Sequence, residues 1–174
     1  MQNILMKPAS TFQVSAKGSD LLKSIEQLRL EPYDDQTGKA ISLWVKGATI
    51  GYGHLIASGD WNKYRDGVTQ EQADTLFMRD LEPFANVVRS KVTADISQNQ
   101  FDALVIFVFN IGVNGFSTSS ALKLVNDPAA VTDYPNLEAA WKAWNKSQRR
   151  VMKGLVNRRN AEWDIYSKNI YQRW

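Results

Sequence analysis

The sequence predicts an α+β fold that is mainly helical, with a small β-hairpin or sheet lobe followed by a helical C-terminal lobe. Residues 34–55 combine turn residues with short β-branched and Gly-punctuated runs. After residue 68, most apolar residues recur at helical spacing. A chain of 174 residues with 44% hydrophobic residues can fill one compact core or two small lobes.

The first helix is predicted to begin at Ser15 or Ser19, since either can serve as N-cap. It should stop before Pro32, because a proline disfavours helical geometry at the preceding residue. Glu26 then lies about one turn from the helix end. Residues 1–14 lack clear periodicity and are expected to form an N-terminal arm. The apolar positions that predict the helix are Leu21, Leu22, Ile25 and Leu28.

The next segment is predicted to form a small antiparallel sheet. Residues 34–39 are typical of a turn, and residues 41–45 alternate and contain β-branched side chains. Residues 49–54 form another extended, Gly-punctuated run. The polar, Gly-containing residues 56–67 predict a loop that ends this lobe.

Two capping boxes predict the main helices. Thr69 to Gln72 opens a long helix, which Pro83 is expected to kink, and Ser97 to Gln100 opens a second one. The second helix is apolar nearly all round, which predicts a central position in its lobe. Its C-cap is Gly112. Further helices are predicted from Ser119 or Ser120 through Val125, over residues 137–144 and over residues 155–166, before a basic tail at residues 169–174.

Composition limits the classes of function. The formal charge of +3 and the pI near 9.1 suit nucleic acid, anionic cell-wall polymers or an anionic membrane, but no nucleic-acid-binding signature is visible, so no nucleic-acid partner is expected. With no cysteine and a single histidine, we expect no disulfide, no metal and no cofactor. No run is apolar and long enough to span a membrane, and the N-terminus lacks a signal-like apolar region. We therefore expect synthesis as a soluble cytoplasmic protein.

The residue types between Glu26 and Thr49 predict glycoside hydrolysis. Breaking an acetal needs a protonated carboxyl to deliver a proton and an ionised carboxylate across the sugar ring. Glu26 has apolar neighbours that favour protonation, whereas Asp35, nine positions on, lies among polar turn residues. Asp34 is a competing second carboxylate. Thr49 supplies a hydroxyl.

The run Glu26-x-Leu-Arg-Leu-x-x-Tyr-x-Asp35 with Thr49-Ile-Gly-Tyr-Gly-His54 resembles the bacteriophage lysozymes, the endolysin muramidases of glycoside hydrolase family 24. The resemblance implies that the catalytic Glu, Asp and Thr of that family fall on Glu26, Asp35 and Thr49. Gln27 stands where the family usually has Gly. The threonine follows the aspartate by fourteen residues instead of the family's six, which implies a longer hairpin within residues 39–47. Thr37 is a second possibility for the threonine.

The resemblance implies a lysozyme-like fold over residues 15–168. It assigns residues 15–67 to a small lobe with the active site, 68–92 to a connecting helix and 93–168 to a helical lobe. It is carried there by Phe-Asp-Ala-Leu from residue 101, by Phe-Asn-Ile-Gly from residue 109 and by Gly-Leu-x-x-Arg-Arg-x-x-Glu from residue 154.

Further roles are implied by the same resemblance. His54 should be structural and pair with Asp80, and Arg150 could reach Glu26 as a salt-bridge partner. Residues expected to contact the saccharide are Leu55, Phe109, Asn110 and Ser119.

The implied reaction is hydrolysis of the β-1,4 bond between N-acetylmuramic acid and N-acetylglucosamine in peptidoglycan. Glu26 would be the general acid, Asp35 the stabilising carboxylate and Thr49 the group that positions water. Inversion is implied, with carboxyl groups about 6.5–9.5 Å apart. We expect a monomer that acts on the periplasmic cell wall after a holin or another lesion releases it from the host cytoplasm.

Two other functions fit the sequence. A non-catalytic module could bind the wall or perturb an anionic membrane through its basic C-terminal helices, residues 149–174. A hydrolase for chitin or a related glycan is the other.

Overall fold

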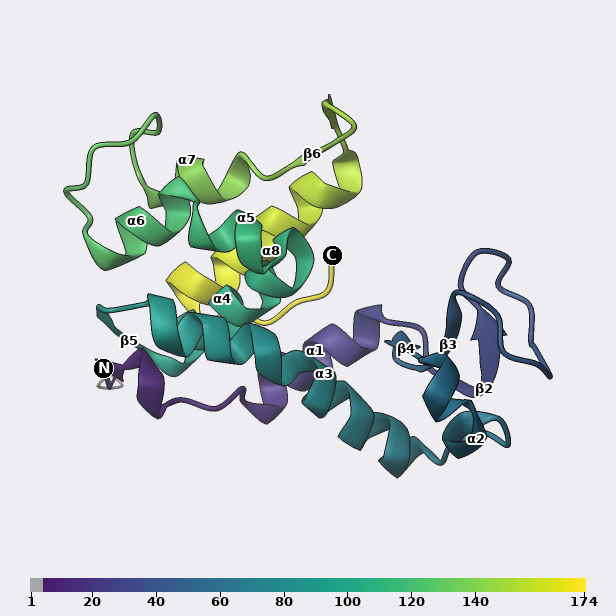
Figure 1. Ribbon diagram of the computed structural model, residues 1–174. Coiled ribbons are helices and arrows are strands. Elements are labelled where there is room, and N and C mark those ends of the chain that lie inside the picture. Colours follow the sequence, from purple (N-terminus) through teal and green to yellow (C-terminus); the bar gives the residue numbers. More distant parts are fainter. Residues whose placement is uncertain (1–4) are drawn as a thin grey trace. The chain divides into compact units, whose positions relative to one another are not determined.

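The structure is a computed structural model that describes residues 5–174 (Figure 1). It divides into two compact units. Unit 2 is Leu22–Glu82, and unit 1 contains the described residues up to Leu21 together with Pro83–Trp174. The boundaries fall inside two helices, α1 (Ala16–Ile25) and α3 (Gln70–Lys91), so each helix contributes residues to both units. Residues 1–4 of the expected N-terminal arm lie outside the described part.

Unit 2 is built on a three-stranded antiparallel sheet in the order β2-β3-β4 (Figure 1). The strands are β2 (Arg29–Asp34), β3 (Ala48–Gly51) and β4 (His54–Leu55). Thr49 in the middle strand lies opposite Tyr33 on one side and Leu55 on the other. The long loop between β2 and β3 extends from one end of the sheet.

The predicted end of the first helix is wrong. Helix α1 ends at Ile25, and the chain from Arg29 onward is a strand instead of the last helical turn. Arg29 lies opposite Gly51, so pairing with β3 determines the conformation of a segment whose apolar spacing also fits a helix. The N-cap of α1 is Ser15, whose Oγ accepts a hydrogen bond of 3.1 Å from the backbone N–H of Gly18.

The predicted strand over residues 41–45 is also wrong. Only Ala40 forms an isolated bridge there, with Tyr33, and Ile41 N–H donates to the carbonyl of Pro32. Strand β3 pairs with β2, so the alternating run has no partner strand and forms a bent loop. An alternating pattern yields a strand only where a second strand completes its hydrogen bonds.

The core of unit 2 is small. Side chains alternate along a strand, so Ala48 and Ile50 face the core and Thr49 faces the opposite side of the sheet. Ile56 and Leu76 complete the buried cluster, which is covered by partly buried aromatic and aliphatic side chains. Part of this cover comes from Trp61 and Tyr64 in the short helix α2 (Trp61–Tyr64), which follows the 3₁₀ helix η2 (Ser58–Asp60).

Both predicted capping boxes are present. At α3, Thr69 Oγ1 accepts from Gln72 N–H at 3.1 Å, and Thr69 N–H donates to Gln72 Oε1 at 2.9 Å. Ser97 and Gln100 make the same reciprocal pair at α4 (Gln98–Ile111). Gly112 ends α4 with φ of 84°, as predicted for a helix C-cap.

Unit 1 is organised around α4, whose residues from Phe101 to Val108 are all buried. Helix α8 (Lys153–Lys168) packs against it (Figure 1). The other helices of unit 1 are α5 (Val113–Ser117), α6 (Ser120–Asn126), α7 (Leu137–Lys142) and η1 (Ala9–Thr11). Its short paired strands are β1 (Lys7–Pro8) with β5 (Asp95–Ile96), and β6 (Lys146–Ser147) with β7 (Arg150–Val151). Helices α4, α6, α7 and α8 fall where the sequence predicts them, but α5 and these strand pairs were not predicted.

A buried ionic network joins α7 and α8. Glu162 is fully buried and receives hydrogen bonds from Arg158 Nε at 2.9 Å and from Trp141 Nε1 at 3.0 Å. Arg159 Nη2 lies 3.2 Å from the same carboxylate. Burial raises the pKa of Glu162 against the opposing effect of both arginines, and burial lowers the pKa of Arg159 to about 10.

Among the described residues, no helix is both long enough and apolar enough to cross a membrane. The observed class is the α+β, mainly helical fold that the sequence predicts.

Candidate active site

A single backbone carbonyl links two of the three expected catalytic residues. The carbonyl oxygen of Gly47 accepts a hydrogen bond from Asp35 N–H at 3.1 Å and another from Thr49 Oγ1 at 2.9 Å. Asp35 directly follows β2, and Thr49 belongs to β3. The thirteen residues between them therefore form a loop that returns to the same place, so that both residues bond to one carbonyl.

Gly47 is required at this point for two reasons. Its φ of 100° lies in a region that favours glycine. A Cβ at this position would lie 2.3 Å from Asp35 Oδ1, so the carboxylate occupies the space that a side chain would need. Gly47 thus sets the position of Asp35 through both its backbone and its missing side chain.

The two neighbouring aspartates have different environments. Asp34 Oδ1 accepts from Gln36 N–H at 3.0 Å, and Asp34 Oδ2 accepts from the Thr37 hydroxyl at 3.1 Å. Asp34 therefore stabilises the turn that follows β2. The side chain of Asp35 is exposed and makes no such turn contact with the described residues. Thr37 is likewise engaged in this turn, which weakens it as an alternative to Thr49.

Glu26 lies immediately after α1, and its backbone N–H donates to Leu22 O at 3.2 Å. It is electrostatically close to Tyr33 in β2. Burial is the largest cause that raises the pKa of the Tyr33 phenol, and the charges of Asp35 and Glu26 raise it further while Arg29 opposes them. The Arg29 guanidinium lies 4.5 Å from the centre of the Tyr33 ring. The charges of both carboxylates therefore act on the Tyr33 phenol, beside which the Arg29 guanidinium lies.

His54 and Asp80 lie together as the sequence resemblance implied. His54 Nδ1 is 2.8 Å from Asp80 Oδ2 and 3.1 Å from Oδ1. The His54 ring also makes an edge contact with Tyr64, with centroids 5.4 Å apart. Because His54 is opposite Ile50, it lies on the core side of the sheet, away from the face that carries Thr49. This placement favours a structural role.

The expected saccharide contacts have varied surroundings. Leu55, opposite Thr49 in the sheet, is 63% exposed. In unit 1, Phe109 makes an edge contact with Phe84, and Asn110 is exposed with its Oδ1 held by Arg159 Nη2 at 2.5 Å. That bond fixes the orientation of the Asn110 amide.

Ser119 has a structural role at the start of α6. It is the N-cap of α6, accepting from Leu122 N–H at 3.0 Å and donating to Phe116 O at 2.8 Å. Its side chain is buried, so its single O–H donor is already used within unit 1.

Arg150 is exposed in β7, directly after a two-residue turn. Both turn residues, Gln148 and Arg149, have positive φ. The exposed turn agrees with the charged character of this segment.

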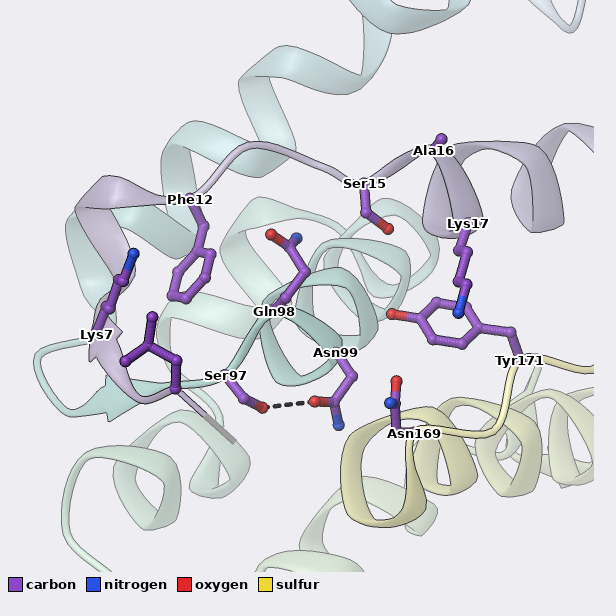
Figure 2. A pocket seen from close by; sticks show the side chains of 11 residues that line it. Lys7, Phe12, Ser15, Ala16, Lys17, Ser97, Gln98, Asn99, Asn169 and Tyr171 are labelled. Carbon is purple, nitrogen blue, oxygen red and sulfur yellow. Dashed lines mark hydrogen bonds between the residues drawn. The ribbon is translucent and has the colours of Figure 1, made fainter. Parts of the chain in front are cut away.

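A pocket of about 690 Å³ lies elsewhere, between the first and last described segments of unit 1 (Figure 2). Lys7, Phe12 and Lys17 line it together with Asn99 and Tyr171. Several of its polar groups already have partners, since Tyr171 OH donates to the buried carboxylate of Asp102 at 2.7 Å and Asn99 Nδ2 donates to two carbonyls of α8. The hydrogen bonds of these lining residues join separate segments of unit 1. The described residues that line the pocket include none of the expected catalytic set.

The sequence analysis assigned no role to Gly47, Tyr33, Arg29 or Arg159. Arg29 and Tyr33 are part of the motif that carries the resemblance, so their presence there was the available signal. Gly47 could be found only from the folded loop, because its role depends on where Asp35 lies. Arg159 was visible as the second arginine of the Gly-Leu-x-x-Arg-Arg-x-x-Glu motif from residue 154.

Comparison with known proteins identifies the family. The model of the phage lysozyme family matches residues 23–162. The endolysin of Acyrthosiphon pisum secondary endosymbiont phage 1 is 35% identical over 155 residues, covering 87% of this chain and 95% of the relative. The endolysin of Bacillus phage PZA is 36% identical over 159 residues, covering 90% of this chain, and the chain spans 55% of that relative's length.

A solved structure gives the same result. The endolysin from Escherichia coli O157:H7 phage FAHEc1 has a TM-score of 0.71 and 31% sequence identity, covering 94% of this chain and 98% of that one. The resemblance seen in the Glu26 to His54 motif is thus confirmed at the level of the family and its lysozyme-like fold. This chain belongs to the phage lysozyme family, a family of cell-wall hydrolases.

Proposed function

We propose that this chain is a muramidase that hydrolyses the β-1,4 bond between N-acetylmuramic acid and N-acetylglucosamine in peptidoglycan. In this proposal Glu26 protonates the leaving oxygen. Asp35, ionised across the sugar ring, stabilises the developing positive charge and serves as base for the attacking water. Products of inverted configuration are expected.

The observation that best supports this proposal is the shared carbonyl of Gly47. It accepts the backbone N–H of Asp35 at 3.1 Å and the hydroxyl of Thr49 at 2.9 Å, so the residue that carries the carboxylate and the residue that carries the hydroxyl share one acceptor. The different surroundings of the two aspartates favour Asp35 over Asp34, since the Asp34 oxygens are used by the turn. Family membership provides independent support.

Thr49 is suited to position water. Its hydroxyl proton is donated to Gly47 O, so its oxygen can only accept a further hydrogen bond. A water that donates to this oxygen would have a lone pair free to attack, and Asp35 could accept the second water proton. Positioning of this kind lowers the barrier by holding the nucleophile in a reactive geometry.

The saccharide contacts proposed with this reaction are made by Leu55, Phe109 and Asn110. Ser119 would act through the cap of α6, because its hydroxyl donor is already engaged. A salt bridge between Arg150 and Glu26 stays a prediction. We further propose that the enzyme works as a monomer on the periplasmic wall after release by a holin or another lesion.

The test compares the wild type with Glu26→Gln. Outer-membrane-stripped Gram-negative cells are followed by loss of turbidity, and the soluble products are analysed for new reducing ends. We expect lysis and muramic-acid reducing ends from the wild type, with a loss of at least about a hundredfold in the variant because the proton donor is removed.

Equal lysis by both proteins without new reducing ends would contradict the proposal. That outcome would favour the membrane-perturbing module with its basic C-terminal helices. Comparison of purified peptidoglycan with chitin separates the proposed substrate from a related glycan.

A further inference from the structure

The loop between β2 and β3 exposes three consecutive apolar side chains. Leu43 is 76% exposed, Trp44 is 40% exposed and Val45 is 37% exposed. Such a cluster contributes little to the core and often marks a surface that binds a ligand or partner. It lies in the loop between β2 and β3, outside the strands of the sheet.

Trp44 differs from its neighbours because its ring is held in place. Trp44 Nε1 donates to the carbonyl oxygen of Ile56 at 2.9 Å. This bond satisfies the only polar atom of the indole and restricts rotation of the ring. A rigid aromatic ring that remains partly exposed can bind an apolar face with little loss of side-chain entropy.

The hydrogen bond from Trp44 to Ile56 links the Trp44 ring to the strand beside the candidate active site. Ile56 N–H donates to Ala48 O at 2.7 Å, so the end of β4 is attached to the start of β3 beside Thr49. Leu55 precedes Ile56 and lies opposite Thr49. Side chains of directly opposite residues share a face of the sheet, so the exposed Leu55 lies on the face of the buried Thr49, one residue before the carbonyl to which Trp44 is attached.

We propose that Trp44, together with Leu55, forms a saccharide-binding platform that contacts the glycan strand of peptidoglycan next to the residues that cleave it. The ring would pack against the C–H face of a pyranose or against an N-acetyl methyl group. This inference rests on the proposed function and adds to it a specificity residue within the hairpin insertion.

Charge favours a glycan over an anionic membrane as the occupant. Unit 2 contains ten Asp and Glu residues against seven Lys and Arg residues, a formal charge of −3. This negative charge would repel an anionic bilayer, whereas it would not repel the uncharged apolar face of a sugar.

The test measures binding and turnover separately. Calorimetry with Glu26→Gln protein and purified, peptide-free glycan oligosaccharides gives the affinity without cleavage. We expect Trp44→Ala in this background to weaken binding about tenfold, equivalent to about 1.4 kcal/mol. Trp44→Phe keeps an aromatic ring without the indole anchor and should give an intermediate affinity, while Leu43→Ala, which removes a more exposed side chain, should change it less than about twofold.

Kinetics with the otherwise wild-type enzyme supply the second readout. Trp44→Ala should raise KM with little change in kcat, because the platform binds the substrate before and during the reaction alike. Unchanged glycan affinity in Trp44→Ala would overturn the inference. So would equal losses in Trp44→Ala and Leu43→Ala, or a loss seen only for vesicles of anionic phospholipid.

The two proposals fail in different ways. If the wild type produces no reducing ends, the proposed hydrolysis fails, but the calorimetric comparison still decides whether Trp44 binds glycan. If hydrolysis depends on Glu26 and binding is unaffected by Trp44→Ala, only the platform is wrong.

Discussion

The two units differ in what determines their structure. Unit 1 surrounds the buried helix α4 with aromatic side chains, and Phe107 stacks on Trp141 with centroids 4.4 Å apart. Unit 2 has a small buried cluster of four residues, and Asp35 and Trp44 lie exposed in the loop that joins β2 to β3. In unit 1, side-chain packing determines the structure. In unit 2, backbone turns and glycine conformations determine where the chemical groups lie.

This difference shows where sensitivity to mutation should lie. A core side chain in unit 1 should affect stability far more than turnover. A loop glycine in unit 2 should affect turnover far more than stability.

Phe107→Ala should have the largest effect on stability. Phe107 is fully buried and contacts Trp141, Phe116 and the Arg159 guanidinium. Loss of its ring should lower the free energy of unfolding by about 3–5 kcal/mol, measured by urea denaturation, because a cavity replaces it. At a temperature where the variant stays folded, kcat should change less than about threefold.

Val131→Ala is the matched control in unit 1, since Val131 is 97% exposed. It should change stability by less than about 0.5 kcal/mol. A large drop in kcat for folded Phe107→Ala would contradict the claim that core side chains of unit 1 affect stability far more than turnover.

Gly47→Ala should reduce turnover about a hundredfold. The new Cβ would lie 2.3 Å from Asp35 Oδ1, and displacement of a reacting group by about 1 Å can cost that much. The measurement is the release of reducing ends under saturating substrate, with stability followed in parallel.

Gly38→Ala supplies the control for backbone strain. Gly38 also has positive φ, 69°, but a Cβ there would meet nothing within 4 Å. Both variants should lose similar stability, and only Gly47→Ala should lose most of its activity. Equal activity in the two would show that the position of Asp35 does not depend on Gly47.

Tyr166→Phe should have the smallest effect and only at high pH. Burial raises the pKa of Tyr166 from 10.0 to about 12, so the phenol ionises first in the unfolded chain. The stability it contributes is complete below about pH 10 and is lost as pH rises toward 12. Urea unfolding at pH 9 and pH 11 should show that the variant loses about 1 kcal/mol less than the wild type over this interval.

An unchanged pH dependence in Tyr166→Phe would contradict this account of the aromatic core. The phenyl ring of the variant should keep the contacts with Trp141 and Trp163, so little difference is expected at pH 7.

The helices of unit 1 could be predicted because their signals are local. Ser97 with Gln100 and the apolar run after them give both the start and the burial of α4, and Gly112 gives its end. The short strand pairs such as β6 and β7 have no comparable signal, since each is only two residues long.

Unit 2 was harder to predict because its conformations depend on distant partners. Arg29 is in a strand because Gly51 lies opposite it, although its neighbours have helical spacing. Residues 41–45 have a strand-like pattern but no partner strand. The residue types proposed for catalysis were visible in the motif, whereas the role of Gly47 required knowledge of the loop that returns to Asp35.

The most direct test of the central claim compares Asp35→Asn with Asp34→Asn. The account holds that Asp35 acts on the substrate and that Asp34 stabilises the turn, where an asparagine oxygen can replace the carboxylate. Reducing-end release should fall about a thousandfold in Asp35→Asn and stay within about tenfold of wild type in Asp34→Asn. An active Asp35→Asn beside an inactive Asp34→Asn would contradict the account.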